Sequence, residues 1–235
     1  MIVSNKKCIK KDFCVTINST PLIQCDHYKY LGVVIDKNLS WKHHVEYIST
    51  KVSKACGILS KLRHCLNSQV LIEIYNALIH SYIRYGIIAW GNASEATLKP
   101  LQILMNRALR IITFAPFGRI NIKPIYRDFK VLNVTNTLFL ETSKHMFKLK
   151  NNLFPLRFAD YFVLYENSSP NSYELRSRVR NDNVHIAITR LQSSNKSIQI
   201  RGEKLWTDLP DDTKVISTFP CFKKMIKSHL IENHM

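Results

Sequence analysis

The clearest periodic pattern in the chain is an apolar stripe between residues 40 and 66. Apolar side chains recur there at alternating spacings of three and four, which is the repeat of one face of an α-helix. Ser40 precedes the stripe and is a suitable N-cap, because its hydroxyl can accept from a free amide of the first turn. The pattern predicts a long amphipathic helix with Ser40 at its start. The inward positions are Val45, Ile48, Val52, Ala55, Leu59, Leu62 and Leu66.

Two further helices are predicted downstream of this stripe. One starts near Asn67 or Ser68 and continues to about Gly91, and the next starts at Ser94 and stops before Pro116. The inward positions predicted for the first of the two are Leu71, Ile74, Tyr75, Leu78, Tyr82 and Tyr85. Those of the second are Leu98, Leu101, Met105, Ala108 and Ile112.

Strand-like alternation comes before the helices. Phe13 and Ile17 belong to an alternating segment, residues 18–21 form a turn cluster, and residues 28–35 supply one or two further strands. Gly32 interrupts that second segment, which indicates a bulge or a close approach of another backbone.

The last hundred residues are less regular. Residues 131–150 and 219–230 have helical patterns, with Phe222 and Ile226 among the inward positions of the second. Ile198 and Ile200 suggest a short strand, and residues 166–172 form the best linker candidate. The expected fold is α+β, mainly α. It has four parts: a β-hairpin region at 1–37, a helical bundle at 38–118, a further helical region at 119–165 and a small mixed basic region at 166–235.

Charge narrows the class of partner. The 235 residues carry 34 Lys and Arg against 17 Asp and Glu, a formal net charge of +17. Such a surplus favours a polyanionic partner, nucleic acid first, although ribosomal, chromatin and membrane-surface proteins share it. The six cysteines have no C-x-x-C spacing, and residues 1–7 have no apolar run of the signal-peptide type. We expect an intracellular protein of the nucleus or cytoplasm, with no membrane span and no small-molecule substrate.

Basic side chains concentrate where acids are absent. No Asp or Glu occurs between Glu46 and Glu73, or between residues 96 and 127. Basic faces on helices suit a phosphate backbone, although an ordinary solvated helix surface has the same appearance. The candidates in these two stretches are Lys51, Lys54, Lys61, Arg107, Arg110, Arg119 and Lys123.

A third basic group alternates along one segment. Arg176, Arg178 and Arg180 would point the same way if this segment is extended, about 6–7 Å apart, near the spacing of successive phosphates. In a loop the alternation has little meaning.

Aromatic and imidazole side chains have competing interpretations. Tyr75, Tyr82, Tyr85 and Trp90 are either stacking platforms for single strands or, as we favour for most of them, core residues of an apolar helix. His43 and His44 are adjacent and lack a third metal ligand at a useful spacing, so we expect His44 to pack or cap at the helix start.

Several short motifs together resemble one enzyme family. Residues 30–36 read Tyr-Leu-Gly-Val-Val-Ile-Asp and are followed by Leu-Ser-Trp at 39–41 and by His44. Residues 74–81, 107–112 and 173–176 extend the likeness, as do Leu205 and Trp206. In order and spacing they resemble the end of the palm, the thumb and the post-thumb region of non-LTR, Jockey-like retrotransposon reverse transcriptases.

The resemblance implies roles for these segments. Tyr30, Leu31 and Gly32 would be the tip of the primer grip, the hairpin that presses the primer 3′ end toward the active site. Gly32 would let the nucleic-acid backbone approach closely. The helices from 40 to 114 would be the thumb, which closes on an RNA/DNA primer–template, and the basic residues would hold phosphates without sequence preference.

The same resemblance implies that the chemistry lies elsewhere. In this family the catalytic aspartates, which hold two Mg²⁺ ions, lie upstream of the Tyr30 motif. Asp211-Asp212 follows Leu-Pro rather than Tyr/Phe-x, so it suits a turn or a helix cap. We expect a nucleic-acid-binding fragment that needs no cofactor and has no polymerase activity alone. The alternatives are one part of a split, active reverse transcriptase, or a co-opted basic module that binds another protein.

Overall fold

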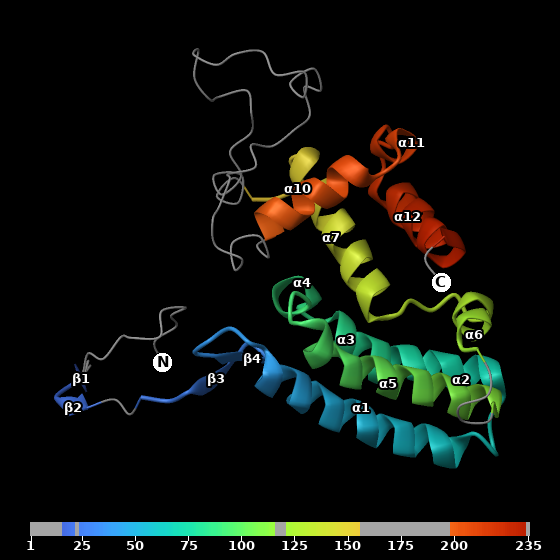
Figure 1. The fold of residues 1–235 in the computed structure, drawn as a ribbon, viewed down its shortest axis with the longest axis horizontal. Helices are drawn as coiled ribbons and strands as arrows, with labels where there is room; N and C mark the ends of the chain where they lie inside the picture. The colour runs from blue at the N-terminus through green and yellow to red at the C-terminus, as the bar shows by residue number, and fades with distance from the viewer. Residues whose placement is uncertain (1–15, 22–23, 116–120, 156–197, 234–235) are drawn as a thin grey trace. The chain divides into compact units, whose positions relative to one another are not determined.

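The computed structural model describes residues 16–21, 24–115, 121–155 and 198–233. The chain divides into two units, Met1–Ile125 and Tyr126–Met235, and each is described here by itself. The architecture is mainly helical with two small antiparallel hairpins, which confirms the predicted α+β class (Figure 1). Within the ranges described, no helix is both long and apolar enough to cross a membrane.

The two hairpins come first in the chain. Strands β1 (Thr16–Ile17) and β2 (Thr20–Pro21) pair antiparallel, and so do β3 (His27–Tyr30) and β4 (Val33–Asp36). This confirms a turn at Asn18 and Ser19 and the strands predicted within 28–35, whereas Thr20 and Pro21 of the predicted turn cluster form β2. Residue 13 lies outside the described residues.

The second hairpin turns at Leu31 and Gly32. The φ angle is positive at both residues, 45° at Leu31 and 82° at Gly32. Tyr30, which precedes them, pairs directly with Val33, which follows them. Two consecutive positive φ values are the geometry of the two-residue turn that matches strand twist. Gly32 therefore forms the turn, and the predicted bulge is wrong.

Helix α1 (Lys42–Leu62) follows the second hairpin and contains the predicted stripe. The inward positions from Val45 to Leu59 are buried, whereas Leu62 and Leu66 are partly buried. The predicted N-cap is wrong: Trp41 occupies that position, in the left-handed conformation with φ 64°, and makes no side-chain cap. The Ser40 hydroxyl donates to the carboxylate of Asp36 and accepts, at 3.5 Å, from the amide of Lys42 at the start of the helix.

The second predicted helix is interrupted. It consists of α2 (Ser68–Tyr75), the π-helical turn η1 (Asn76–His80), α3 (Ser81–Arg84) and α4 (Ile87–Trp90). The start near Asn67 or Ser68 is confirmed, and the Asn67 side chain caps it. A continuous helix to Gly91 is wrong, because Tyr85 is extended and Gly86 is left-handed.

The π-turn changes which side chains face inward. The Ser81 amide donates to the Asn76 carbonyl, a five-residue spacing that widens the turn. Ile79 and Ile83 are consequently buried, whereas Tyr82 is exposed. The inward stripe is therefore displaced by one residue from the positions predicted at 78 and 82.

Helix α5 (Glu95–Thr113) completes the first unit. The predicted start at Ser94 is confirmed, and the Ser94 side chain caps the helix, which ends at Phe114 with φ 57°. Helix α5 packs along α1, and α2 contacts both. The three helices bury Leu59, Leu71 and Met105 among the core residues between them.

The second unit is built around one central helix. Helix α6 (Lys123–Asp128) crosses the boundary between the units, and α7 (Val134–Lys150) contacts both α10 (Ile198–Asp208) and α12 (Phe219–Asn233), with the short α11 (Asp211–Lys214) before α12. The helices predicted at 131–150 and 219–230 are confirmed.

Three aromatic rings mark the core of this unit. Phe147, Trp206 and Phe222 are buried, and the ring of Phe222 lies 4.5 Å from that of Phe147 and 5.9 Å from that of Trp206. The strand predicted at Ile198 and Ile200 is wrong, since both residues belong to α10. The linker predicted at 166–172 lies outside the described residues.

Candidate nucleic-acid interface

The tip of the β3–β4 hairpin is exposed. Tyr30 and Leu31 have 60% and 73% of their surface accessible, and Gly32 is exposed beside them. An exposed apolar side chain at a turn is not explained by core packing. These three residues, the primer-grip candidates, therefore form a surface feature of the first unit.

One tyrosine holds this tip to the helical layer. The Tyr85 hydroxyl donates to the Leu31 carbonyl oxygen at 2.7 Å. A Cβ on Gly32 would lie 3.3 Å from Cε1 of the Tyr85 ring, and Gly32 has φ 82°. The structure thus gives Gly32 two reasons to lack a side chain: the turn conformation and the aromatic ring against it.

The break after α3 positions Tyr85. Gly86 has φ 62°, and a Cβ there would lie 3.3 Å from Cγ2 of Val33 in the hairpin. Trp90 donates from Nε1 to the Tyr85 carbonyl oxygen at 2.9 Å. The helix is interrupted where the hairpin packs against it, and the interruption turns Tyr85 toward the tip.

His44 fastens the second strand of the hairpin to α1. The Val34 amide donates to His44 Nδ1 at 3.1 Å, and the buried imidazole meets Trp90 edge-on at 5.4 Å between ring centroids. Because Nδ1 accepts, the neutral ring carries its proton on Nε2. Burial lowers the pKa of His44 from 6.5 to about 4, so the ring is neutral at pH 7. The packing role predicted for His44 is confirmed.

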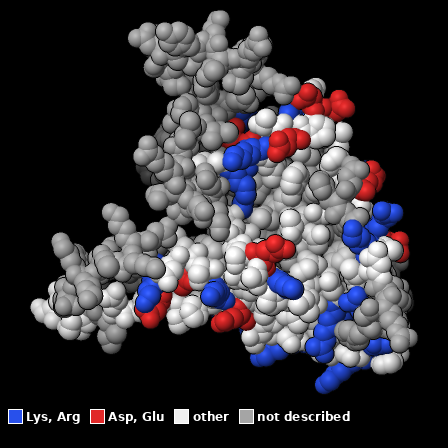
Figure 2. All heavy atoms as spheres, in the orientation of Figure 1, with Lys and Arg blue, Asp and Glu red and all other residues white. Residues whose placement is uncertain are grey.

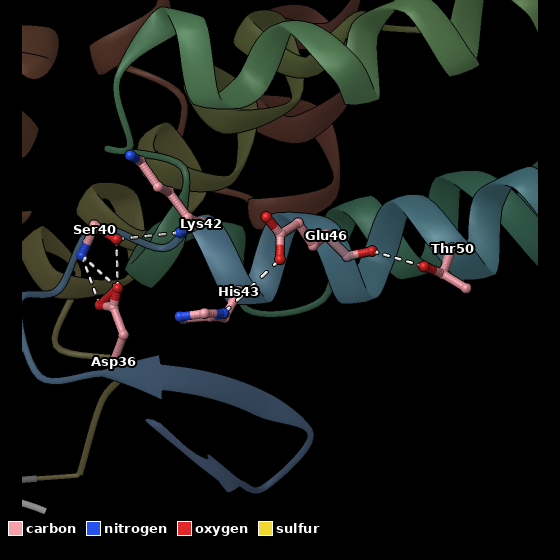
Figure 3. A network of polar contacts seen from close by, with 6 residues as sticks. All are labelled: Asp36, Ser40, Lys42, His43, Glu46 and Thr50. Atoms are coloured by element: carbon pink, nitrogen blue, oxygen red, sulfur yellow. Dashed lines mark hydrogen bonds and ion pairs between the residues drawn. The ribbon is translucent and has the colours of Figure 1, made fainter. Parts of the chain in front are cut away.

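Asp36 joins the end of the hairpin to the start of α1. Its buried carboxylate accepts from the Ser40 amide at 2.7 Å and from the Ser40 hydroxyl (Figure 3). Lys37 donates to Asp26 at 2.8 Å, and this hydrogen bond is the main reason that the pKa of the Asp26 carboxyl is lowered. Both aspartates therefore have structural partners within the protein.

No group of three or more His, Cys, Asp or Glu suited to a metal ion occurs among the residues that the structure describes. Asp211 and Asp212 lie in the first turn of α11, where Asp211 pairs with Lys214 at 3.0 Å. Pro210 holds the N-cap position and no side chain caps this helix, so the two aspartates belong to the helix itself rather than to a turn or a cap.

The predicted basic residues lie on separate elements. Lys54 and Lys61 are exposed on α1, and Lys51 is partly buried there. Arg107 is exposed and Arg110 partly buried on α5, and Lys123 is exposed at the start of α6. Arg119, Arg176, Arg178 and Arg180 lie outside the described residues. Figure 2 shows Lys and Arg side chains gathered toward the end of the layer where α1 ends.

The structure brings Lys51 together with two residues that the sequence reasoning missed. The Nζ of Lys51 lies 5.7 Å from the centroid of the Tyr47 ring, and the Nζ of Lys29 lies 4.6 Å from the same centroid. Tyr47 and Lys51 are four residues apart on one helix, which was visible in the sequence. The approach of Lys29 depends on the hairpin and was not.

The candidate stacking aromatics divide into two classes. Tyr75 and Trp90 are fully buried core residues, as favoured from the sequence. Tyr82 and Tyr85 are 40% and 57% exposed. Tyr85 lies beside the hairpin tip, so an exposed aromatic face adjoins the primer-grip candidates.

Comparison with known proteins identifies the relatives. No protein-family model and no solved structure matches the chain. The probable RNA-directed DNA polymerase from transposon X-element of Drosophila melanogaster is 32% identical over 143 residues, 59% of this chain and 15% of that protein. The RNA-directed DNA polymerase from mobile element jockey is 28% identical over 139 residues in Drosophila melanogaster and 30% over 107 residues in Drosophila funebris.

The chain is similar to part of the non-LTR retrotransposon RNA-directed DNA polymerases. The match to the jockey protein of Drosophila melanogaster covers 57% of this chain and 15% of that protein. The match to the jockey protein of Drosophila funebris covers 44% of this chain and 12% of that protein. The chain thus spans less than a sixth of the length of these relatives. The resemblance found from the motifs is confirmed.

Proposed function

We propose that the chain is a nucleic-acid-gripping part of a retrotransposon RNA-directed DNA polymerase. The observation that carries the proposal is the β3–β4 hairpin, whose tip is exposed at Leu31 yet held by the hydrogen bond from Tyr85. A rigid, exposed tip suits a surface that positions a ligand, because little conformational freedom is lost on binding. Its relatives are polymerases that are RNA-directed and make DNA, which makes a primer–template the ligand proposed here.

The basic faces support the same partner. Lys54 and Lys61 are exposed and seven residues apart on α1, so they share one helix face. Each phosphate that a lysine neutralises releases condensed counterions, and affinity then depends steeply on salt. In this proposal the hairpin contacts the primer end and α1 contacts the backbone, while the Mg²⁺-dependent chemistry belongs to other parts of the polymerase.

Fluorescence anisotropy with a labelled RNA/DNA primer–template tests the proposal. Binding is measured between ~50 and ~200 mM salt for the full chain and for Lys54→Ala plus Lys61→Ala. Lys204→Ala plus Lys224→Ala is a control of equal charge change at exposed positions of the second unit. We expect the first pair to weaken binding and to reduce its salt dependence more than the control. Absent or salt-independent binding of the unmodified chain would refute the proposal.

A further inference from the structure

Two lysines from different elements meet at one tyrosine. Lys29 on β3 donates from Nζ to the Tyr47 hydroxyl oxygen at 3.0 Å. Its Nζ also lies 4.6 Å from the Tyr47 ring centroid, and that of Lys51 lies 5.7 Å from it. The two ammonium groups are therefore no more than about 10 Å apart, on a ring that attracts cations.

The secondary structure brings these three residues together. Lys29 pairs with Val34 across the hairpin, so the two side chains lie on the same face of it. This is the face through which β4 packs on α1. Tyr47 and Lys51 lie one turn apart on the adjoining surface of α1. The rings of His27 and His43 stack at 4.6 Å between the same two elements, so the contact continues along the hairpin.

The lysines lack acidic partners. Among the described residues, no carboxylate lies within 4 Å of Lys29 or Lys51. The neighbouring acids contact other groups: Asp26 pairs with Lys37 at 2.8 Å, and Glu46 lies 3.8 Å from His43 (Figure 3). The hydrogen bond from Lys29, and then the charges of both lysines, lower the pKa of the Tyr47 hydroxyl. The cluster therefore has a surplus of positive charge.

We propose that Lys29, Tyr47 and Lys51 form a binding site for the backbone phosphates of a nucleic acid. The Tyr47 oxygen accepts from Lys29, which leaves the hydroxyl hydrogen to donate to a phosphate oxygen. Two ammonium groups about 10 Å apart or less can contact one phosphate or two neighbouring ones. This site deepens the proposed function and rests on it. It places a phosphate contact beside the hairpin, at residues other than Lys54 and Lys61.

The test compares matched pairs of lysine substitutions in the full chain. Lys29→Gln plus Lys51→Gln removes both ammonium groups, and Lys42→Gln plus Lys224→Gln removes the same charge from other exposed positions. With the labelled primer–template, we expect the first pair to reduce the salt slope by roughly 1–2 and the affinity at ~100 mM salt by about tenfold relative to the control. Tyr47→Phe keeps the ring but loses the hydroxyl, and we expect a smaller loss of affinity. Far-UV circular dichroism and urea unfolding establish that each variant is folded.

The outcomes separate this site from the proposed function. If the unmodified chain binds and both lysine pairs have the same slope and affinity, the site is refuted while the proposed function stands. If the unmodified chain does not bind, both fail. A poly-glutamate competitor that displaces the primer–template equally well per charge would also overturn the site, because it would show no preference for phosphates over carboxylates.

Discussion

The Tyr85 hydroxyl donates to the carbonyl oxygen of Leu31, a residue 54 positions earlier in the chain, at 2.7 Å. This bond connects the most exposed part of the hairpin to the break between α3 and α4. The strand pairing, the contacts of Val33 and Val34 and the hydrogen bond from Lys29 to Tyr47 hold the rest of the hairpin. The position of the primer-grip candidates therefore depends on a residue that lies outside their motif.

Replacing Tyr85 with Phe should loosen the tip while leaving the fold intact. The ring still covers Gly32, but a hydrogen bond worth about 0.5–1.5 kcal/mol is lost. We expect amide hydrogen exchange in β3 and β4 to accelerate roughly threefold to tenfold, with little change in the helices. Equal acceleration throughout the first unit would show that the bond supports the whole unit rather than the tip.

Two glycine-to-alanine substitutions should have opposite effects on stability. Gly32→Ala places a Cβ at φ 82° and 3.3 Å from the Tyr85 ring, and we expect it to destabilise the protein by about 1–2 kcal/mol. Gly57→Ala lies within α1 with no atom within 4 Å of the new Cβ, and we expect it to stabilise by about 0.5–1 kcal/mol. Urea unfolding measures both. A neutral Gly32→Ala would contradict the left-handed turn.

His44 should make stability depend on pH in the acidic range. Its pKa is about 4 in the folded protein and 6.5 when unperturbed, so between these values only the unfolded chain takes up the proton. Stability is therefore complete above about pH 6.5 and falls as the pH decreases toward 4, by up to about 3 kcal/mol.

The control for this prediction is His44→Gln, which cannot titrate. Burial also lowers the pKa of His145 in the second unit, and that group acts in the same direction. The contribution of His44 is therefore the difference between the pH profiles of the two proteins in urea unfolding. Parallel profiles would show that the folded imidazole titrates normally.

Gly202 should resist any larger residue because α10 lies close to α7. A Cβ there would lie 2.5 Å from the Met146 sulfur, inside contact distance. We expect Gly202→Ala to cost about 1–3 kcal/mol in urea unfolding. Combined with Met146→Ala, which removes the clash, it should cost less than the sum of the two single changes. Strict additivity would mean that the two helices separate to accommodate the methyl group.

Local patterns in the sequence determined much of the helical framework. The three-and-four spacing from Val45 to Leu59 predicted α1, because burial of one face is a property of a single helix. Asn67 and Ser94 marked helix starts correctly, since an N-cap bonds to an amide only a few residues away. The inward positions Phe222 and Ile226 of α12 were also predicted from the local pattern, and both are buried.

Other assignments depended on partners distant in the sequence. The Ser40 hydroxyl donates to Asp36, and Trp41 takes the N-cap position of α1. The extended Tyr85 with the left-handed Gly86 breaks the helix where the hairpin packs. Ile198 and Ile200 could not decide between strand and helix, because two apolar residues fit the periodicity of both. In the structure they belong to α10, which packs against α7.

The features of the candidate interface also divide into those that the sequence determined and those that depended on the tertiary structure. The sequence by itself determined the charge surplus, the positions of Lys54 and Lys61 on one helix face, and the resemblance to reverse transcriptases, because all three are properties of residue identity and local spacing. Only the tertiary structure decided that Lys29 meets Lys51 at Tyr47 and that Tyr85 holds Leu31. Those contacts join residues of the hairpin to helices elsewhere in the chain, and no local periodicity encodes such a meeting.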